Sequence, residues 1–506
     1  MGSIISGARQ HTETDVLDDA RRLATCLALA GIGSGDTVAL VMRNDIAFIT
    51  ASVAANLLGA TAVPVNWHFS ASEAAYVIRD CAARAIILHA DLWRSLAPDL
   101  PPDLVAGKLL IGVRTPPELA AAYRLAPQNC TVPDGITDLA QVLRDTAPMP
   151  ADKPVPVTAM IYTSGTTGHP KGVRRLGPSI PSKDGYGRIF QPGLRTLLPT
   201  PLYHSAPNRF GVMTFFCGGE LVLMPRFDAE DTLRLIEKHR ITAMFIVPTM
   251  LIRLLKLPAE IKDRYDLSSL SDVVCAGAPC PFEVKRGIID WWGPCFYEFY
   301  GSTETSALTW CTSAEALEKP GTVGRAVASA TVKILDETGA ECPPGVPGEV
   351  YGRLHGNADF TYHNRPQDRA DVERDGLITS GDIGYLDEDG YLFLSDRKRD
   401  MIIAGGVNIY PAHIEEAMLQ LPGVVDVAVF GIPDPEMGEA ICAVVAPESG
   451  VSLETDNLHA ALSGQIARYM LPKVIVIDPD MPRDASGKVN KRKLRDQYWS
   501  GTGRAI

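Results

Sequence analysis

Hydrophobic and polar positions in the first 300 residues switch repeatedly between helical and strand-like spacing. Residues 15–30 carry apolar side chains three or four positions apart, at Val16, Leu17, Ala20, Leu23, Ala24 and Leu27. This spacing predicts an amphipathic helix. The turn GIGSGD follows and leads into the apolar run TVALVM, which predicts a buried strand. Helices and strands that alternate in this way are typical of an α/β protein with doubly wound sheets.

Four further apolar runs lead into loops of small and polar residues. They are VTAMIY (157–162), TAMFIVP (242–248), SDVVCAGAP (271–279) and CFYEF (295–299). In open α/β sheets, ligands bind beyond the carboxyl ends of the strands. We therefore expect these four loops to converge on one site.

The pattern changes after about residue 320, where Gly and Pro become frequent. Turns at Gly339 and at Asp389–Gly390 separate alternating runs and predict a β-rich segment of hairpins. A shorter α/β pattern follows, with helices at 411–421 and 455–469 and strands VVDVAVFG, AICAVVA and KVIVID. Its length of about 110 residues is enough for a small domain. We predict one domain over 1–396 and a second over 397–506, with the boundary near Arg397 to Asp400.

Composition and charge restrict the class of protein. Of 506 residues, 46% are hydrophobic and 21% are charged, which is typical of a soluble globular chain. The net charge of −12 argues against a nucleic-acid partner. No apolar run reaches the length of a membrane span and no signal-peptide pattern is present, so we expect a cytoplasmic protein. The ten cysteines and ten histidines show neither C-x-x-C nor H-E-x-x-H spacing, so we expect no metal site built by the protein alone.

Residues 162–173, YTSGTTGHPKGV, predict a loop that holds phosphate. Its glycines let the backbone approach a ligand, its hydroxyls donate hydrogen bonds and its lysine supplies charge. It is not a Walker loop, because Pro170 stands where that motif needs its second Gly and Gly172 follows Lys171. A flexible surface turn is the alternative, but the apolar run that enters the loop favours a binding role.

Five motifs then follow one another along the whole chain: YTSGTTGHPKG, YGSTE, SGDIGYLDEDGYL, DRKRDMIIAGG and PRDASGK. In this order they resemble the adenylate-forming superfamily of acyl- and aryl-CoA synthetases, firefly luciferase and peptide-synthetase adenylation domains. The resemblance implies an α/β fold with a large N-terminal domain of several subdomains, doubly wound sheets and a β-rich subdomain among them. It also implies a small, mobile α+β C-terminal lid. The implied reaction joins ATP and a carboxylate into an acyl-adenylate with release of pyrophosphate, and a thiol then attacks the adenylate.

The resemblance also implies which residues bind ATP. The loop around the β- and γ-phosphates comprises Thr163, Ser164, Gly165, Thr166, Thr167, Gly168 and Lys171. The segment on one face of adenine comprises Gly277, Ala278 and Pro279, and YGSTE supplies Tyr300, Gly301, Ser302, Thr303 and Glu304. In this reading Tyr300 stacks on adenine, Thr303 bonds the α-phosphate and Glu304 holds Mg²⁺ through a hard oxygen.

Further positions near and beyond the predicted boundary match the family's motifs. Asp382 would bind the ribose hydroxyls, although this chain reads SGD where the family often reads TGD. Arg397 would contact ribose, and Arg399 stands at the hinge position, where Lys or Asp is common. Lys488 would bridge the substrate carboxylate and the α-phosphate. A solvated basic tail is the alternative for that lysine, but the preceding Ser486–Gly487 distinguishes it from its neighbours.

The acid and the thiol are indicated less directly. His204 matches a position that gates the acyl pocket, and the other pocket candidates are Asn208, Phe210, Met213, Ala276 and Ala307. No acid lies from Tyr203 to Cys217, which argues against an amino-acid substrate and for an uncharged fatty, aryl or polycyclic acid. No carrier-protein segment follows Lys488, so coenzyme A is the expected thiol, with Gly405 and Gly406 in a loop that lets its pantetheine pass. The segment GRLHGNADFTYHNRP departs from the family pattern, which leaves the alignment at 352–366 open.

Two alternatives to an AMP-forming acid–CoA ligase stay open. One is an acyl-AMP ligase that loads a carrier protein, and the other is a nucleotide-binding protein that has lost catalysis. The presence of Lys171, Glu304 and Lys488 weighs against loss of catalysis. The expected partners are a small carboxylic acid, ATP, Mg²⁺ and coenzyme A, and the sequence leaves open whether the chain forms a homodimer.

Overall fold

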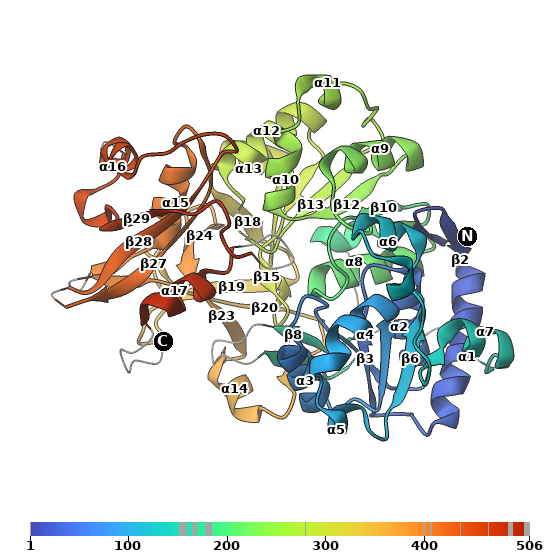
Figure 1. The fold of residues 1–506 in the computed structure, drawn as a ribbon. Helices are drawn as coiled ribbons and strands as arrows, with labels where there is room; N and C mark the ends of the chain where they lie inside the picture. The colour runs from blue at the N-terminus through green and yellow to red at the C-terminus, as the bar shows by residue number, and fades with distance from the viewer. Residues whose placement is uncertain are drawn as a thin grey trace.

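The computed structural model describes residues 2–150, 159–163, 170–177, 185–278, 280–397, 400–404, 407–435, 437–463, 465–483 and 489–499. Within these ranges the chain forms a mixed α/β fold with a large N-terminal domain and a small C-terminal domain. The C-terminal strands and helices gather on one side of the molecule, away from the N-terminus (Figure 1). The predicted fold class is confirmed.

Two sheets form the core of the large domain. The smaller is wholly parallel, in the order β4 (Thr61–Pro64), β3 (Thr37–Val41), β5 (Ala85–His89), β6 (Leu109–Val113) and β7 (Thr137–Asp138). Among the described residues, the larger has 14 strands. Its parallel part runs β14 (Phe296–Glu298), β13 (Asp272–Cys275), β12 (Ala243–Ile246), β10 (Arg195–Leu198), β11 (Glu220–Leu223) and β1 (Ser3–Ser6), with β2 (Arg9–Thr12) antiparallel at the edge.

Helices cover both faces of these sheets because neighbouring strand residues point to opposite sides. Leu198 and Leu223 pack in a core shared with the smaller sheet, whereas Leu197 and Val222 pack on the other face. The shared core contains α1 (Glu13–Leu29), α2 (Ile46–Leu57) and α8 (Ser205–Phe216). The other face of the large sheet carries α9 (Ala229–His239), α10 (Pro248–Leu255) and α12 (Phe282–Trp292), and the outer face of the smaller sheet carries α3 (Ala71–Asp80) and α4 (Ala90–Leu96).

The helix expected over 15–30 is confirmed as α1. It begins at a capping box, in which the Thr12 hydroxyl accepts a hydrogen bond from the Asp15 backbone N–H at 3.2 Å and the Asp15 carboxylate accepts one from the Thr12 N–H at 2.9 Å. Two backbone donors at the helix start are thereby satisfied. Its buried residues, at Val16, Ala20, Leu23, Ala24 and Leu27, follow the predicted stripe.

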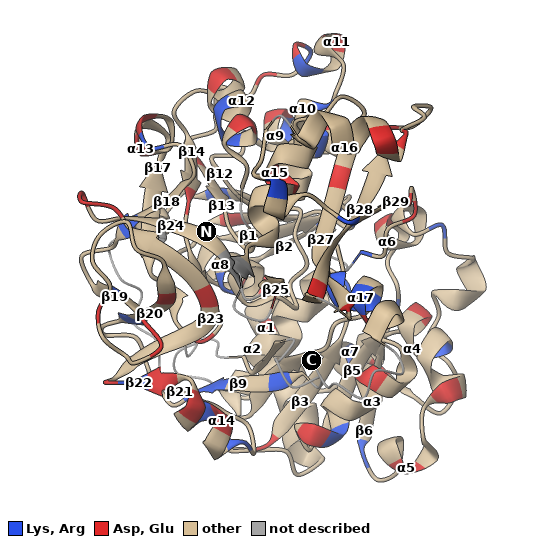
Figure 2. Cartoon of the chain, turned by 90° about the vertical axis from the view of Figure 1, so that its left-hand side faces the viewer, with Lys and Arg blue, Asp and Glu red and all other residues tan. Residues whose placement is uncertain are grey.

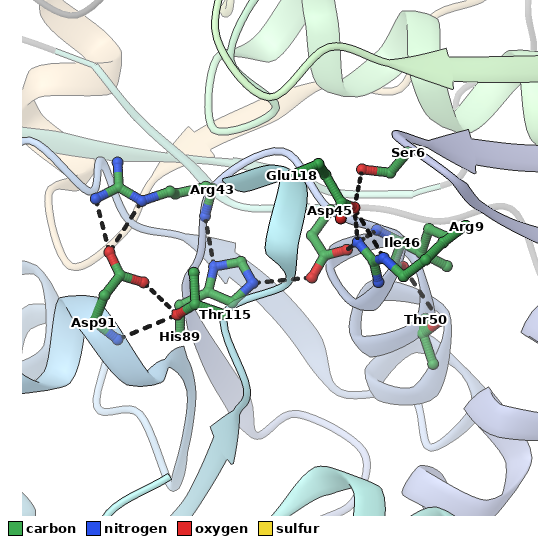
Figure 3. A network of polar contacts seen from close by, with 10 residues as sticks. All are labelled: Ser6, Arg9, Arg43, Asp45, Ile46, Thr50, His89, Asp91, Thr115 and Glu118. Carbon is green, nitrogen blue, oxygen red and sulfur yellow. Dashed lines mark hydrogen bonds and ion pairs between the residues drawn. The ribbon is translucent and has the colours of Figure 1, made fainter. Parts of the chain in front are cut away.

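A buried polar network ties the first hairpin to the smaller sheet (Figure 3). The Arg9 guanidinium lies 2.6 Å from Asp45 Oδ1 and 2.6 Å from Glu118 Oε1. His89 Nε2 lies 2.9 Å from Asp45 Oδ2, and both side chains are almost wholly buried. Burial favours a raised pKa for Asp45, but the hydrogen bond from His89 and the charge of Arg9 outweigh it and hold the pKa below its ordinary value. The charged form of Asp45 therefore stabilises the fold.

The β-rich segment continues the large sheet. Its antiparallel strands are β17 (Thr309–Thr312), β18 (Thr322–Ala326), β24 (Tyr391–Arg397), β23 (Leu377–Leu386), β20 (Gly348–Leu354) and β19 (Ala330–Leu335), with β22 (Glu373–Arg374) paired to β23. Gly390 has a φ of +80° in the turn between β23 and β24, and Gly339 has a φ of +91° between β19 and β20. Both predicted turns are confirmed, since each needs a backbone conformation that favours glycine.

The apolar run VTAMIY ends in a third sheet of the large domain. The carboxyl end of VTAMIY forms β8 (Ile161–Thr163), which pairs antiparallel with β9 (Lys171–Arg175). With β21 (Phe360–Tyr362) these strands make a separate three-stranded sheet. Residues 164–169 lie outside the described ranges, so the expected convergence of this loop with the other three on one site stays a prediction.

The C-terminal domain contains one five-stranded sheet with helices beside it. Its strands are β25 (Ile402–Ala404), β26 (Val407–Ile409), β27 (Val424–Asp434), β28 (Gly438–Pro447) and β29 (Val474–Ile477), and its helices are α15 (Pro411–Leu419), α16 (Thr455–Ser463) and α17 (Lys491–Trp499). The prediction of one helix over 455–469 is wrong, because α16 ends at Ser463 and 468–470 form a separate 3-10 turn. The residue after Ser463 is Gly464, a poor helix former. Strand β24 ends at Arg397 and β25 begins at Ile402 in another sheet, and the boundary near 397–400 stays a prediction.

The remaining helices lie on the surface. They are α5 (Pro102–Val105), α6 (Pro117–Ala122), α7 (Leu139–Asp145), α11 (Ala259–Lys262), α13 (Ser313–Glu318) and α14 (Pro366–Asp371). Basic and acidic residues alternate on α11, α12 and α14 (Figure 2), as on ordinary water-exposed helices. Among the described residues, no helix combines the length and apolar content that a membrane crossing needs.

Candidate nucleotide-binding active site

The site begins where β12, β13 and β14 end side by side. These three strands are parallel neighbours, so their carboxyl ends share one edge of the sheet. Gly277 follows β13 with a φ of +92°, a conformation that glycine adopts without strain. A Cβ added there would have Val247 Cγ1 as its nearest neighbour, at 3.8 Å, so this turn is open on its ligand side. The expected convergence of these three loops is confirmed.

A buried ion pair supports the last of these strands. The Lys285 ammonium on α12 contacts the Glu298 carboxylate on β14, and both side chains are 1% exposed. The same ammonium donates to the Thr322 carbonyl at 2.7 Å. Burial raises the pKa of Glu298, and the nearby Lys285 charge opposes that rise. The pair fixes the end of β14 two residues before Tyr300.

Tyr300 and Asp382 meet although they come from distant parts of the chain. The Tyr300 hydroxyl donates to Asp382 Oδ2 at 2.7 Å. Asp382 lies on β23, where its register partner on β24 is Arg397. The tertiary structure thus brings the residues expected at adenine and ribose into one place, with the backbone of Arg397 beside them.

The YGSTE segment forms a tight hairpin of β15 (Gly301–Ser302) and β16 (Ser306–Ala307). A Cβ on Gly301 would stand 1.8 Å from the Ser306 carbonyl oxygen, so only glycine fits there. The Ser302 hydroxyl accepts hydrogen bonds from the backbone N–H groups of Glu304 at 3.2 Å and Thr305 at 3.1 Å. These contacts fix the turn that presents Thr303 and Glu304.

Strand β21 holds the Glu304 carboxylate. The Tyr362 hydroxyl donates to Glu304 Oε1 at 2.9 Å. Burial, and next the negative charge of Glu304, raise the pKa of Tyr362, so its hydroxyl stays protonated and remains a donor. This bond fixes the direction of the carboxylate that the sequence predicts to hold Mg²⁺.

Strand β9 brings two basic side chains to the same place. Lys171 and Arg175 share one face of the strand because they are four positions apart. The Lys171 ammonium lies 2.8 Å from Asp368 and 5.3 Å from the centre of the Tyr362 ring. Arg175 donates to the Thr303 carbonyl at 2.5 Å and to the Ser306 hydroxyl at 3.1 Å. The strand that follows the predicted phosphate loop is therefore joined to the YGSTE hairpin.

The acyl-pocket candidates lie around α8 and at the ends of the sheet strands. His204 precedes the first residue of α8, and its ring lies 4.4 Å from that of Tyr203. Asn208 donates to the Leu202 carbonyl at 2.9 Å, which fixes the turn before the helix. Phe210 and Ala276 are buried in the shared core, Ala307 is buried beside Gly301, and Met213 is half-buried. Their role in binding an acid stays a prediction.

Several predicted residues lie outside the described ranges. They are Ser164, Gly165, Thr166, Thr167, Gly168, Pro279, Arg399, Gly405, Gly406 and Lys488. Of Arg397 only the backbone is described. Thr163, Lys171 and Ala278 are described, and Thr163 ends β8 as the register partner of Lys171.

Tyr362, Asp368 and Arg175 did not emerge from the sequence as site residues. Arg175 could have been found from the alternation in KGVRR, which places it on the same strand face as Lys171. Tyr362 and Asp368 lie in or just after the segment whose family alignment was open, and no local pattern marks them. The pairing of β21 with β9 brings Tyr362 to the hairpin, and the contact with Lys171 places Asp368 beside them.

The residues present fit a magnesium nucleotide. Mg²⁺ in such sites binds one or two carboxylates together with substrate phosphates, rather than a protein-built cage. Glu304 offers one hard carboxylate, of which Oε1 accepts the hydrogen bond from Tyr362. Among the described residues, no group of three or more His, Cys, Asp or Glu side chains could hold a metal by itself. Lys171 would supply a cation for phosphate, and Asp382 would offer carboxylate oxygens to ribose hydroxyls.

Comparison with known proteins places this site in a family. Residues 3–359 match the AMP-binding enzyme family, and residues 413–488 match the AMP-binding enzyme C-terminal domain. The chain is 33% identical to a feruloyl-CoA synthase of an Amycolatopsis species over 500 residues, covering 97% of this chain and 95% of that protein. It is 32% identical to the long-chain-fatty-acid–CoA ligase FadD13 of Mycobacterium tuberculosis over 507 residues, covering 95% and 91% of the two chains.

Solved structures agree with this assignment. ATP-bound MatB from Rhodopseudomonas palustris superposes with a TM-score of 0.81 at 27% identity, covering 98% of this chain and 96% of that one. The chain belongs to the AMP-binding enzyme family, among its AMP-forming acid–CoA ligases.

Proposed function

We propose that the chain activates a carboxylic acid with an uncharged fatty, aryl or polycyclic tail and transfers the acyl group to coenzyme A. In the first step a carboxylate oxygen attacks the α-phosphorus of ATP, and pyrophosphate leaves. In the second step the thiol of coenzyme A attacks the acyl carbon, and AMP leaves with the bonding electron pair. Activation is needed because a free carboxylate is a poor electrophile, whereas AMP is a good leaving group.

The observation that carries the proposal is the meeting of three remote segments. Tyr362 contacts both Lys171 and Glu304, and Asp382 contacts Tyr300 at the start of the same hairpin. Pyrophosphate departure builds negative charge, which preplaced cations and donors stabilise. Lys171 and Thr303 would meet the phosphates, Glu304 would hold Mg²⁺, and Tyr300 and Asp382 would hold the nucleoside. Bound Mg²⁺ would neutralise charge that develops on the phosphate oxygens.

The uncharged tail follows from the charges around α8. An amino-acid substrate would need a carboxylate to pair with its amine, and residues 203–217 contain no Asp or Glu. Buried Phe210 and Ala276 make the neighbourhood apolar. The names of the two relatives, a feruloyl-CoA synthase and a long-chain-fatty-acid–CoA ligase, support aryl and fatty acids as the classes to test first.

The C-terminal domain would complete the site with residues that lie outside the described ranges. We assign Lys488 to the substrate carboxylate and the α-phosphate, Arg399 to a hinge, and the Gly405–Gly406 loop to pantetheine passage. The corresponding domains are 1–396 and 397–506. These assignments rest on the motifs of the sequence and on the match of 413–488 to the family's C-terminal domain.

One assay tests the proposal against its alternatives. AMP release from ATP would be measured with a panel of fatty, aryl and polycyclic acids, without acceptor, with coenzyme A, and with an acyl-carrier protein. We expect turnover that needs both an acid and coenzyme A. Turnover that needs the carrier protein would instead identify a carrier-loading ligase, and no AMP release with any acid would indicate a protein that has lost catalysis.

A further inference from the structure

Ser306 has a strained backbone conformation at the end of the YGSTE hairpin. Its φ is +61°, in the left-handed region that residues other than glycine rarely adopt. Short hairpin loops often end on a residue in this conformation, and glycine is the usual choice. Serine is strained there because its Cβ crowds the following carbonyl oxygen. Contacts from the surrounding structure are therefore needed to hold Ser306 in this conformation.

Two side chains from outside the hairpin donate to the Ser306 hydroxyl. Asn357 Nδ2, in the loop between β20 and β21, donates to it at 2.8 Å, and Arg175 Nη2, on β9, donates to it at 3.1 Å. A hydroxyl oxygen has two acceptor lone pairs, so these two bonds use both. Within the hairpin, the Thr305 hydroxyl donates to the Ser306 carbonyl at 3.1 Å. The side chain and the backbone of Ser306 are thus both held.

The Arg175 guanidinium joins the two ends of the turn that carries Thr303 and Glu304. The nitrogen that donates to Ser306 also donates to the Thr303 carbonyl at 2.5 Å, and Nη1 donates to the Ala358 carbonyl at 3.1 Å. A guanidinium presents its N–H groups as a rigid fork, so the positions of these acceptors are fixed relative to one another. Strand β9 is itself held between β8 and β21, and Figure 2 shows β9 and β21 side by side.

We propose that Arg175 and Asn357 are positioning residues for adenylation, which hold Ser306 in its left-handed conformation and thereby fix Thr303 and Glu304 at the nucleotide. The proposal rests on the proposed function of the chain, in which Thr303 meets the α-phosphate and Glu304 holds Mg²⁺. Groups fixed before the reaction stabilise the transition state most, and a small displacement of them is costly. The effect should therefore appear in kcat rather than in the KM for ATP.

Two substitutions of Ser306 separate this role from ordinary packing. Ser306→Ala removes the hydroxyl that is held but keeps the Cβ that disfavours the left-handed conformation. Ser306→Gly removes more atoms, yet glycine adopts a φ of +61° without strain. We expect the kcat of acid-dependent ATP–pyrophosphate exchange to fall about tenfold in Ser306→Ala and less than about threefold in Ser306→Gly. The KM for Mg·ATP should change less than about twofold in both variants, because ground-state binding is retained.

Substitutions of the two donors test the same contacts from the other side. Arg175→Met keeps the aliphatic stem but removes the fork, and kcat should fall about ten- to hundredfold. Arg175→Lys keeps the charge without the fork, so it should remain impaired. Asn357→Ala should lower kcat about three- to tenfold in the wild-type background, as for loss of one hydrogen bond. It should have no further effect in Ser306→Gly, because the contact through which Asn357 acts is already absent.

Arg240 offers a matched control, because it has a φ of +50° near the amino end of β12, whereas the site lies at the carboxyl ends of the strands. Arg240→Ala and Arg240→Gly should both leave the exchange rate unchanged. Urea unfolding of each variant would measure any loss of stability separately.

Three results would overturn the proposal. They are a kcat in Ser306→Ala equal to or above that in Ser306→Gly, full activity in Arg175→Lys, and losses confined to the KM for Mg·ATP. Failure of the proposed function would appear differently, as wild-type protein that shows no exchange with any acid, and it would remove the inference that rests on it.

Discussion

The Tyr362 hydroxyl donates to the Glu304 carboxylate at 2.9 Å, across a sequence separation of 58 residues. Because Tyr362 occupies only Oε1, the second carboxylate oxygen of Glu304 could bind a cation. It also joins the YGSTE hairpin to β21 and, through the pairing of β21 with β9, to the strand of Lys171. The carboxylate that the sequence predicts to hold Mg²⁺ is thus oriented by a residue of β21.

We predict that Glu304→Gln lowers the rate of acid-dependent ATP–pyrophosphate exchange by about 10²- to 10³-fold, as for loss of a comparable electrostatic group. The neutral amide would bind Mg²⁺ poorly, so the exchange should also need a higher Mg²⁺ concentration. Tyr362→Phe retains the carboxylate but frees its orientation, and should cost on the order of tenfold.

A matched control is Tyr265→Phe, because Tyr265 donates to Glu230 at the same distance of 2.9 Å but far along the chain from the hairpin. Its exchange rate should equal that of the wild type. An unchanged Mg²⁺ dependence in Glu304→Gln would remove Glu304 from the metal site.

We predict that Lys488→Ala abolishes adenylate formation and spares the second step. The lysine would offset repulsion between the carboxylate and the α-phosphate, which exists only during adenylation. Pyrophosphate exchange should fall by about 10²-fold or more, while conversion of a supplied acyl-adenylate to thioester should change little. Lys493→Ala, in the same basic tail, should leave both rates unchanged. Exchange that survives in Lys488→Ala would show that another group bridges the two anions.

Arg399→Pro should have the reverse effect. Proline fixes φ and removes the backbone donor, which would oppose rotation of the C-terminal domain about this residue. Thioester formation from a supplied adenylate should therefore fall more than adenylation. Both half-reactions would be measured beside Arg399→Ala, which keeps the backbone free and should be milder. Equal loss of both rates would indicate misfolding, and loss of adenylation alone would place the hinge elsewhere.

The buried pair of Lys285 and Glu298 makes a prediction about stability. Lys285→Met would leave a carboxylate buried without its partner and should lower the free energy of unfolding by about 3–5 kcal/mol. The double variant Lys285→Met/Glu298→Leu removes both charges and should recover most of that loss. Urea unfolding would measure the free energy of unfolding of the wild type, the single variant and the double variant. An exposed control, Lys333→Met, breaks the surface pair with Glu341 and should have a much smaller effect. A double variant no more stable than the single one would show that the site needs its charges.

The network of Asp45 makes a prediction about pH (Figure 3). Asp45 faces Arg9, His89 and, through Arg9, Glu118, and its pKa in the folded protein lies below the ordinary 3.8. The folded state therefore binds fewer protons at this carboxyl than the unfolded state does. The resulting stability is present above pH 3.8 and is lost as pH falls through the folded pKa.

Asp45→Asn should lower the free energy of unfolding by about 3–5 kcal/mol at pH 7, because it breaks a buried pair. The difference from the wild type should shrink as the pH falls below 3.8. Urea unfolding at a series of pH values from 7 to below 3.8 would measure this difference in the free energy of unfolding. A difference that stays constant over this range would mean that the charge of Asp45 does not contribute.

Much of the fold and the family could be predicted from local sequence. Helix α1 follows from its apolar spacing and capping residues, and the turns at Gly339 and Gly390 follow from the backbone that glycine permits. The five motifs indicate the family because each concentrates its chemistry within a few consecutive residues. The helix expected over 455–469 was too long, since spacing alone does not show where a helix ends.

Only the tertiary structure decided which distant residues share the site. The run that enters the predicted phosphate loop reads as a buried strand, and it pairs locally with β9 in a sheet that β21, far along the chain, completes. Likewise, Tyr362 and Asp368 carry no local signal, because contacts across sheets and helices depend on packing that a short window of sequence does not contain. The sequence determined the chemistry that the loops can perform, and long-range packing decided which side chains hold those loops in place.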